Sequence, residues 1–209
     1  MSEDNVLNEV GERAMADNRF RIDGGIIAGG LGTRMGGVDK GLLSWHEACF
    51  AEHIASKLRP HCNQLLINCN RNFDRYAVWA DQVIQDDTQD YNGPLEGLKV
   101  LLRASTANYM LLSPCDTPRL PADYAPRMLA TWRKYPEQLI AVKAGDRIHP
   151  LHLLVPTRLH ESISDYLLSG ERRMMRWLEG QQVQYCDFSA EADCFTNVNS
   201  HEALALLGL

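Results

Sequence analysis

At 209 residues and 45% hydrophobic content, the chain is long enough to bury the core of one good-sized domain. Its formal net charge of −6 argues against non-specific binding of nucleic acid or anionic membrane, because both are held mainly by a spread of Lys and Arg side chains. No apolar run approaches the roughly 20 residues of a membrane span, and the N-terminus is acidic where a signal peptide is basic and then apolar, so we expect a cytoplasmic protein.

The first half of the chain has the pattern of β-α units. After a polar leader over residues 1–20, expected to be flexible, a single domain is predicted over residues 21–209. Apolar runs alternate there with amphipathic segments. They predict strands at 25–29, 64–69, 82–85 and 109–114 and helices at 50–58, 73–80, 95–104 and 121–135. The run at 109–114 is almost continuously hydrophobic, which suits the buried centre of a parallel sheet.

The second half adds a change of strand direction. Residues 139–155 predict two strands around a Gly145-Asp146 turn, forming an antiparallel pair at the sheet edge. Helices follow at 158–169 and 171–180, then a strand at 183–188 and a last helix with Ser200 as its N-cap. The predicted fold class is therefore an α/β three-layer sandwich with a mostly parallel central sheet and an antiparallel edge.

The loop after Ala28 is the first candidate site, because ligands of open parallel sheets bind beyond the carboxyl ends of the strands. It holds Gly29, Gly30, Gly32, Gly36 and Gly37. Glycines let backbone N–H groups approach anions closely, Arg34 supplies a planar fork for phosphate oxygens, and Lys40 supplies a mobile point charge. The order Asp39-Lys40-Gly41 does not fit the Walker A pattern, and Met35 stands where a dinucleotide-binding loop needs glycine. We expect a phosphate-binding loop of another kind.

Polar residues follow three other predicted strands. Asp116 stands between two prolines at the mouth of the strand 109–114, where a carboxylate can bind Mg²⁺ or cap a turn. Asp86 is placed to hydrogen-bond a ribose or a base. Asn68 has an amide that suits base recognition, although a purely structural hydrogen bond at the strand end is equally consistent with its position.

The histidines are weaker candidates. His149 and His152 lie three residues apart on a predicted strand and are expected to point to opposite faces, which disfavours a zinc pair. The six cysteines include no Cys-x-x-Cys pair, so we expect them to be reduced and mostly buried.

Four stretches together carry a resemblance to a known family. They are IIAGGLGTRMGGVDKGLL, GPLEG, SPCDTP and NVNSHEAL, and they closely resemble the molybdenum cofactor guanylyltransferases, which make molybdopterin guanine dinucleotide. The similarity runs from about Ile22 to the C-terminus. It implies the Rossmann-like sandwich of the nucleotidyltransferases, with Asp39-Lys40 where sugar-nucleotide and cytidylyl relatives usually have proline before the lysine.

The resemblance implies a GTP site, a Mg²⁺ site and a second substrate site. GTP would contact Ile27, Ala28, Gly29, Gly30, Gly32, Lys40, Asn68, Asp86 and Asp116. Asp116 would also bind Mg²⁺, and Lys40, Arg34 and Asp116 would be the catalytic residues. The residues that match positions for molybdenum-molybdopterin are Arg172, Arg173, Asn197 and Asn199. Cofactor-delivery proteins and molybdoenzyme chaperones would be transient partners.

The implied reaction is transfer of GMP from GTP to the terminal phosphate of the pterin, with release of pyrophosphate. A phosphate nucleophile is already ionised at neutral pH, so no general base is required, and positioning and charge stabilisation carry the catalysis. Two alternatives stay open at this point: a nucleotidyltransferase that uses CTP or a sugar phosphate, and a non-catalytic regulator that binds GTP.

Overall fold

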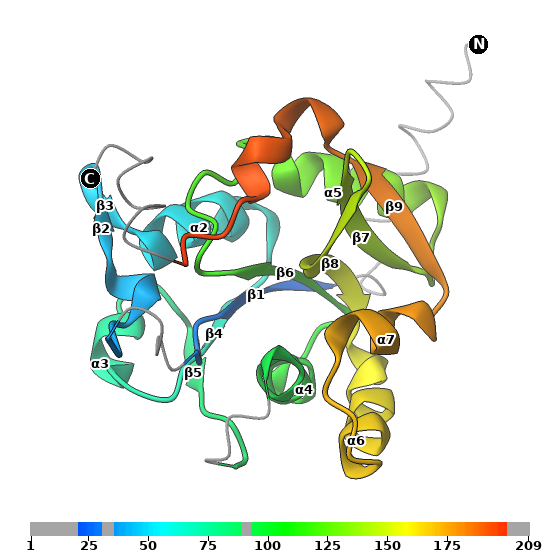
Figure 1. The fold of residues 1–209 in the computed structure, drawn as a ribbon, viewed down its shortest axis with the longest axis horizontal. Coiled ribbons are helices and arrows are strands. Elements are labelled where there is room, and N and C mark those ends of the chain that lie inside the picture. Colours follow the sequence, from blue (N-terminus) through cyan, green and yellow to red (C-terminus); the bar gives the residue numbers. More distant parts are fainter. Residues whose placement is uncertain (1–20, 31–35, 89–92, 200–209) are drawn as a thin grey trace.

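A seven-stranded sheet forms the middle layer of the computed structural model, which describes residues 21–30, 36–88 and 93–199 (Figure 1). The strand order is β5-β4-β1-β6-β8-β7-β9. The strands are β1 (Ile22–Ile27), β4 (Leu65–Asn68), β5 (Gln82–Ile84), β6 (Tyr109–Pro114), β7 (Leu139–Ala144), β8 (Arg147–Pro156) and β9 (Val183–Asp187). Within this sheet β8 runs antiparallel to β6 and β7, whereas the other neighbours pair in parallel. The predicted mostly parallel sheet is confirmed.

The antiparallel pair lies toward one side of the sheet. β7 and β8 are joined by a tight turn in which Gly145 has a φ of 60°, as the Gly145-Asp146 turn predicts. β9 pairs in parallel outside β7 and is the last strand on that side. The antiparallel pair therefore lies one strand in from the edge of the sheet, and β9 is the edge strand.

Helices cover both faces of the sheet (Figure 1). One face carries α2 (Phe50–Leu58) and α5 (Tyr124–Lys134), and the other carries α4 (Pro94–Ala104), α6 (His160–Leu168) and α7 (Met174–Glu179). Successive strand residues face opposite layers: Leu65 and Ile67 pack with α2, whereas Leu66 packs with α4. Two buried apolar layers therefore hold the sheet in place and fix the ends of its strands.

Some boundaries differ from the predictions. Helix α3 (Phe73–Tyr76) ends four residues early, and α5 begins at Tyr124 rather than at residue 121. The later start of α5 keeps Pro126 in the first turn, where a missing N–H removes no intrahelical bond. A small hairpin of β2 (Ser44–Trp45) and β3 (Ala48–Cys49) was not predicted, because strands of two residues carry no periodic signal.

Other expectations concern the ends of the chain and its cysteines. The leader over residues 1–20 and the helix after Ser200 lie outside the described residues. All six cysteines are free thiols, as expected. Among the helices of the described part of the chain, none has the length and apolar character needed to cross a membrane.

Candidate functional site

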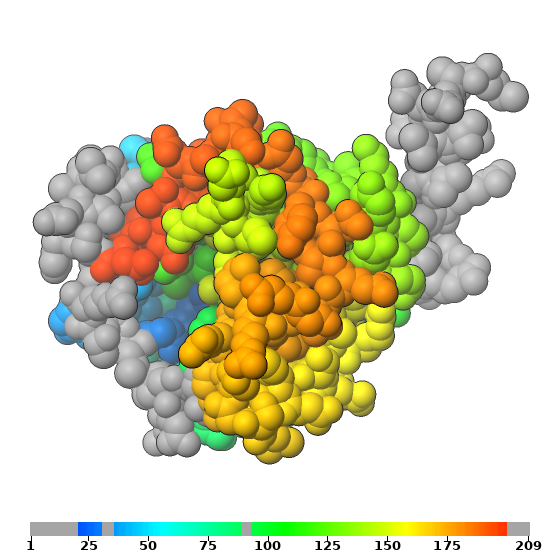
Figure 2. Space-filling model, turned by 45° about the vertical axis from the view of Figure 1, so that its right-hand side comes forward, coloured from blue at the N-terminus to red at the C-terminus, as the bar shows by residue number. Residues whose placement is uncertain are grey.

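The carboxyl ends of four parallel strands meet at one edge of the sheet. Ile27 at the end of β1 pairs with Asn68 of β4 on one side and with Pro114 of β6 on the other, and Asn68 pairs with Ile84 of β5. The loops that follow these strands must therefore lie side by side. Figure 2 shows a hollow whose floor is the blue first strand, between the red stretch near residue 199 and the yellow-orange segment of α6 and α7. The crevice lies where the sequence predicts it.

A cavity of about 350 Å³ occupies one part of this crevice. Its lining residues come from the ends of β1, β4 and β5, from the start of α4 and from β8. They are Ile27, Gly29, Gly30, Asn68, Asp86, Gly93, Pro94, Gly97 and Leu151. We call this space the larger cavity. Among its described lining residues, only Asn68 and Asp86 have polar side chains.

Two amides hold the Asp86 carboxylate in the larger cavity. Asn68 Nδ2 donates to Asp86 Oδ1 at 2.8 Å and to the Ile84 carbonyl at 3.2 Å. Asn70 Nδ2 donates to Asp86 Oδ2 at 2.7 Å and to the Gly29 carbonyl at 3.2 Å, and Asn70 Oδ1 accepts from the Asp86 backbone N–H at 3.1 Å. The structural hydrogen bond of Asn68 at the strand end is therefore present, and because Asn68 also lines the larger cavity, its role in base recognition stays a prediction. Asn70 was not predicted as a site residue. The sequence did hold a signal for it, because a second asparagine two residues after Asn68 follows the same strand end.

A smaller cavity of about 110 Å³ adjoins the first and shares Ile27, Gly30 and Leu151 with it. The residues that line only this part are Ala28, Lys40, Pro114, Cys115 and Asp116. Lys40 lies at the start of the short 3-10 helix η2 (Lys40–Leu42), and its Nζ is 3.7 Å from Asp116 Oδ2. The same ammonium donates a hydrogen bond to Asn199 Oδ1. Three distant chain segments thus supply a cation, a carboxylate and an amide to one point.

The Asp116 carboxyl is largely buried, and one of its oxygens has no hydrogen-bond donor among the described residues. Its side chain is 15% exposed, and its Oδ1 is buried with no hydrogen-bond partner within the part of the chain that the structure describes. Burial raises the pKa of this carboxyl, and the nearby Lys40 ammonium opposes that rise. A buried carboxylate oxygen without a hydrogen-bond donor is available to bind a cation. If Asp116 capped the following turn through this oxygen, a backbone N–H would donate to it, and none of the described residues does so.

Asp39 anchors the loop that carries Lys40. Its Oδ1 accepts from the Tyr76 hydroxyl at 2.5 Å, its Oδ2 accepts from Asn72 Nδ2 at 2.8 Å, and Arg71 Nε lies 3.7 Å from the same oxygen. Burial and the bond to Asp39 both raise the pKa of Tyr76, so the phenol keeps its proton. Asp39 therefore ties its loop to α3 and to Asn72, the residue before that helix. Because Lys40 follows Asp39 directly, these bonds also fix the backbone from which the Lys40 side chain extends.

A family model described as the MobA-like NTP transferase domain matches residues 24–185 of the chain. The chain belongs to the MobA-like NTP transferase family. Every described residue in the expected GTP set lies within the matched range and lines one of the two cavities. The resemblance carried by the four sequence stretches is thus confirmed, and with it the assignment of the chain as a nucleotidyltransferase enzyme.

Full-length relatives support the MobA-like assignment. The molybdenum cofactor guanylyltransferase of Shewanella sediminis is 38% identical over 183 residues, covering 88% of this chain and 93% of that protein. The enzyme of the same name from Pasteurella multocida is 39% identical over 175 residues, covering 84% and 93%. The chain therefore matches these relatives along nearly their whole length.

Solved structures share the MobA-like fold. The molybdopterin-guanine dinucleotide biosynthesis protein A of Archaeoglobus fulgidus superposes with a TM-score of 0.72 at 19% identity, covering 88% of this chain and 96% of that one. The 2-C-methyl-D-erythritol 4-phosphate cytidylyltransferase of Thermus thermophilus gives 0.65 at 12% identity, covering 88% and 95%. At these identities the likeness speaks for the fold alone.

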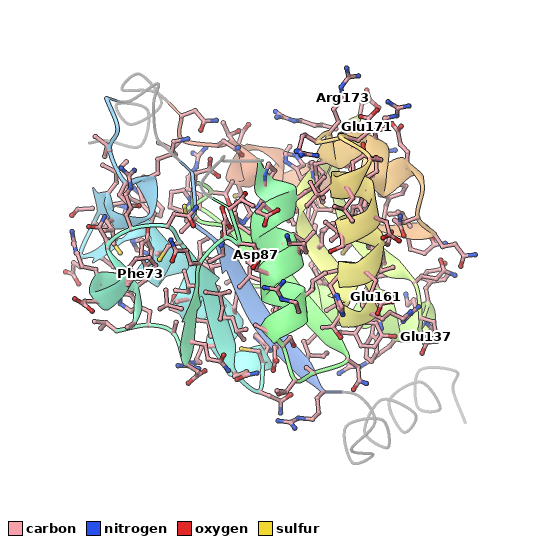
Figure 3. The ribbon with its side chains drawn as sticks, turned by 90° about the horizontal axis from the view of Figure 1, so that it is seen from below. Phe73, Asp87, Glu137, Glu161, Glu171 and Arg173 are labelled. Atoms are coloured by element: carbon pink, nitrogen blue, oxygen red, sulfur yellow. The ribbon has the colours of Figure 1, made fainter. Side chains whose placement is uncertain are left out.

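The residues expected at the second substrate of the MobA-like enzyme are spread out. Asn199 accepts a hydrogen bond from Lys40, which lines the smaller cavity. Asn197, two residues before Asn199, is half-buried. Arg172 is exposed and donates to the carbonyls of Leu167 and Glu171. Arg173 is exposed at the same end of the molecule as the carboxyl end of β1 and points outward (Figure 3). Gly32 and Arg34 lie outside the described residues.

Gly97 gives a test of the larger cavity. Alanine inside α4 normally stabilises a helix relative to glycine by about 1 kcal/mol, but a Cβ here would lie 2.3 Å from Asn68 Oδ1. Asn68 is held in place by Asp86, so it moves only by breaking that bond. We expect Gly97→Ala to raise the KM for GTP and to lower the free energy of unfolding, measured by steady-state kinetics and urea denaturation. In an Asn68→Ala background the same change should cost no stability; a full additive cost there would contradict the proposed collision.

Tyr76 gives a test of the Asp39 anchor. Tyr76→Phe removes the hydroxyl bonded to the Asp39 carboxylate and keeps the buried ring, so the free energy of unfolding should fall by about 1.5–3 kcal/mol. Because Lys40 follows Asp39 directly, we also expect kcat to fall. The half-exposed Tyr185 offers the control Tyr185→Phe, which should change neither quantity. A Tyr76→Phe enzyme with wild-type kcat would show that Lys40 is positioned without this anchor.

Proposed function

We propose that this nucleotidyltransferase transfers GMP from GTP to the terminal phosphate of molybdenum-molybdopterin, giving the guanine dinucleotide cofactor and pyrophosphate. The observation that carries the proposal is the meeting of Lys40 and Asp116 beside a cavity large enough for a nucleoside, in a chain 36–39% identical to proteins named molybdenum cofactor guanylyltransferase. The reaction is one of positioning and charge stabilisation, which this arrangement of residues can supply.

In the proposed complex the nucleoside occupies the larger cavity. The Asp86 carboxylate has about four acceptor positions, and the two amides that hold it use two of them. The free positions suit neighbouring N–H donors such as those on the Watson–Crick edge of guanine. Cytosine and adenine present a single amino group there, so this carboxylate favours GTP over CTP and ATP.

The triphosphate of the proposed complex extends into the smaller cavity. The backbone N–H groups of Gly29 and Gly30 and the Lys40 ammonium would donate to phosphate oxygens, whereas the Ala28 N–H is already bonded to the Asn68 carbonyl. The pterin phosphate then attacks the α-phosphorus in line: a new oxygen–phosphorus bond forms, the bond from the α-phosphorus to the bridging oxygen breaks, and pyrophosphate leaves. No proton has to be removed from the nucleophile, because a phosphate is ionised at neutral pH.

The residues present fit a Mg²⁺ ion. The buried Asp116 Oδ1 lacks a donor, and carboxylate oxygen is the ligand type that Mg²⁺ prefers. Bound to Asp116, the ion would supply positive charge against the phosphate oxygens. Lys40, which pairs with Asp116 in the ligand-free chain, would then be released to donate to the nucleotide.

The proposed second substrate approaches the same end of the molecule. The hollow in Figure 2 is flanked by the yellow-orange segment of α6 and α7 and by the red stretch near residue 199. We propose that residues of these two segments hold molybdenum-molybdopterin, namely Arg172, Arg173, Asn197 and Asn199. We further propose a cytoplasmic location and transient contacts with cofactor-delivery proteins and molybdoenzyme chaperones. These proposals rest on the family assignment.

A related enzyme that uses CTP is the second candidate, because a cytidylyltransferase shares the fold. Thermal unfolding with Mg²⁺ and GTP, CTP, ATP or UTP separates the two readings. We expect GTP to raise the Tm most; a rise with CTP and none with GTP would favour the second candidate. Tight binding of GTP without pyrophosphate release in the presence of molybdopterin would instead indicate a regulator.

A further inference from the structure

Strand β8 contains a bulge beside the candidate site. Its His149 pairs with Val142 of β7, while its Leu153 pairs with the preceding residue, Ala141. Residues 150–152 are therefore extra relative to β7. Pro150 has no N–H to leave unpaired there. Bulges of this kind redirect side chains and are common next to active sites.

The bulge brings the two histidines to the same side of β8. On a regular strand His149 and His152 would point to opposite faces, but their ring centroids lie 5.9 Å apart and both rings contact Phe195. The expectation of opposite faces was wrong because the extra residues break the two-residue alternation. Between the histidines, Leu151 lines both cavities.

His152 is tied to the loop that carries Asp116. Its Nε2 lies 3.0 Å from Thr117 Oγ1, and both side chains are buried. Burial and the neighbouring His149 lower the pKa of His152 to about 3, so the imidazole is neutral and forms an ordinary hydrogen bond. Thr117 directly follows Asp116, so this bond fixes the loop one residue from the carboxylate.

The same imidazole also packs against the segment that carries Asn199. Its ring lies edge-on to Phe195 at 5.0 Å between centroids, at the end of the 3-10 helix η5 (Ser189–Phe195). Three residues later, the Val198 N–H donates to the Asp116 carbonyl at 2.8 Å. Figure 1 shows this orange-red segment descending beside the loop that follows β6. His152 thus contacts Thr117, one residue after Asp116, and Phe195, four residues before Asn199. Asp116 and Asn199 both lie next to Lys40.

We infer that His152, turned inward by the bulge, is a positioning residue that holds the Asp116 loop and the Asn199 segment in register for cation binding. The inference rests on the proposed function, in which Asp116 binds the cation. It gives a role to the His-Pro-Leu-His sequence, which neither the phosphate loop nor the cation ligand explains. His152 touches no reacting atom and acts through Thr117 and Phe195.

The test compares Thr117→Val with Thr117→Ser, and His152→Leu with the double variant Thr117→Val/His152→Leu. Thr117→Val removes the hydroxyl at nearly constant volume, whereas Thr117→Ser keeps it. We expect Thr117→Val and His152→Leu each to weaken Mn²⁺ binding to the nucleotide-free protein, measured by titration with paramagnetic resonance detection, on the order of 10–100-fold. The double variant should bind Mn²⁺ no more weakly than the single variant with the lower affinity. Thr117→Ser should bind Mn²⁺ nearly as tightly as the wild type. In turnover, kcat should fall while the KM for GTP stays close to that of the wild type.

Thr157→Val is the matched control. Its hydroxyl donates to the Ala107 carbonyl at 2.7 Å, beyond the other end of β8, so its loss should lower stability without changing Mn²⁺ affinity. If His152→Leu fails to fold, the two Thr117 variants decide the question. Wild-type Mn²⁺ affinity in Thr117→Val, or additive losses in the double variant, would overturn the inference. Failure of the proposed function differs, because the wild-type chain itself would then form no product.

Discussion

Asp116→Asn is expected to lower kcat by about 10²–10³-fold, the loss typical of removing one preorganised electrostatic contact. The asparagine keeps the shape of the side chain but loses the charge that holds the proposed cation. Stability should move the other way or not at all: burial raises the pKa of Asp116, so its ionised form is disfavoured in the folded protein, and a neutral side chain relieves that cost. The measurement is steady-state GMP transfer beside thermal unfolding of the ligand-free protein.

The control for Asp116→Asn is the same chemical change at Asp193, which is exposed. Asp193→Asn should leave both kcat and Tm unchanged. Near-wild-type turnover of Asp116→Asn would remove Asp116 from the metal role, while a strongly lowered Tm would show that the carboxylate is structural.

Lys40→Ala is expected to lower kcat by a similar factor, about 10²–10³-fold, and to raise the KM for GTP. The ammonium lies between Asp116 and Asn199, where a bound triphosphate would place its oxygens. Without Lys40, the group that opposes the raised pKa of Asp116 is gone, so that carboxyl should protonate at a still higher pH. The loss of Mg²⁺ affinity should therefore begin at a higher pH in Lys40→Ala than in the wild type.

Two further variants separate charge from shape at this position. Lys40→Arg keeps a positive charge but replaces a mobile point with a larger planar fork, so we expect partial activity. Lys134→Ala, at the exposed end of α5, removes the same charge far from the crevice and should have no effect. Equal kcat values for Lys40→Ala and the wild type would show that the lysine only balances Asp116.

The layer architecture and most site residues were predictable because both depend on local signals. The almost unbroken apolar run of β6 identifies a central parallel strand, and polar residues that directly follow such strands, Asp86 and Asp116, must meet at one edge. Lys40 follows from the glycine-rich loop, whose turning residues Gly36 and Gly37 have φ values of 65° and 83°.

The features that were missed depend on pairing between distant segments. A bulge in β8 is defined by its register with β7, so the directions of His149 and His152 do not follow from their spacing. Asn70 is important because β5 places Asp86 opposite it, and Asn199 reaches Lys40 because Phe195 is seated in the core. Such contacts follow from tertiary packing, and a local sequence pattern does not predict them.

The most direct test of the proposed function follows the α-phosphate. The chain is incubated with Mg²⁺, molybdenum-molybdopterin and GTP labelled at the α-phosphorus, and the products are separated. The proposal predicts that the label appears in a pterin guanine dinucleotide with one pyrophosphate released per label transferred, and that CTP does not replace GTP. Label that stays in GTP, or that transfers equally well from CTP, would contradict it.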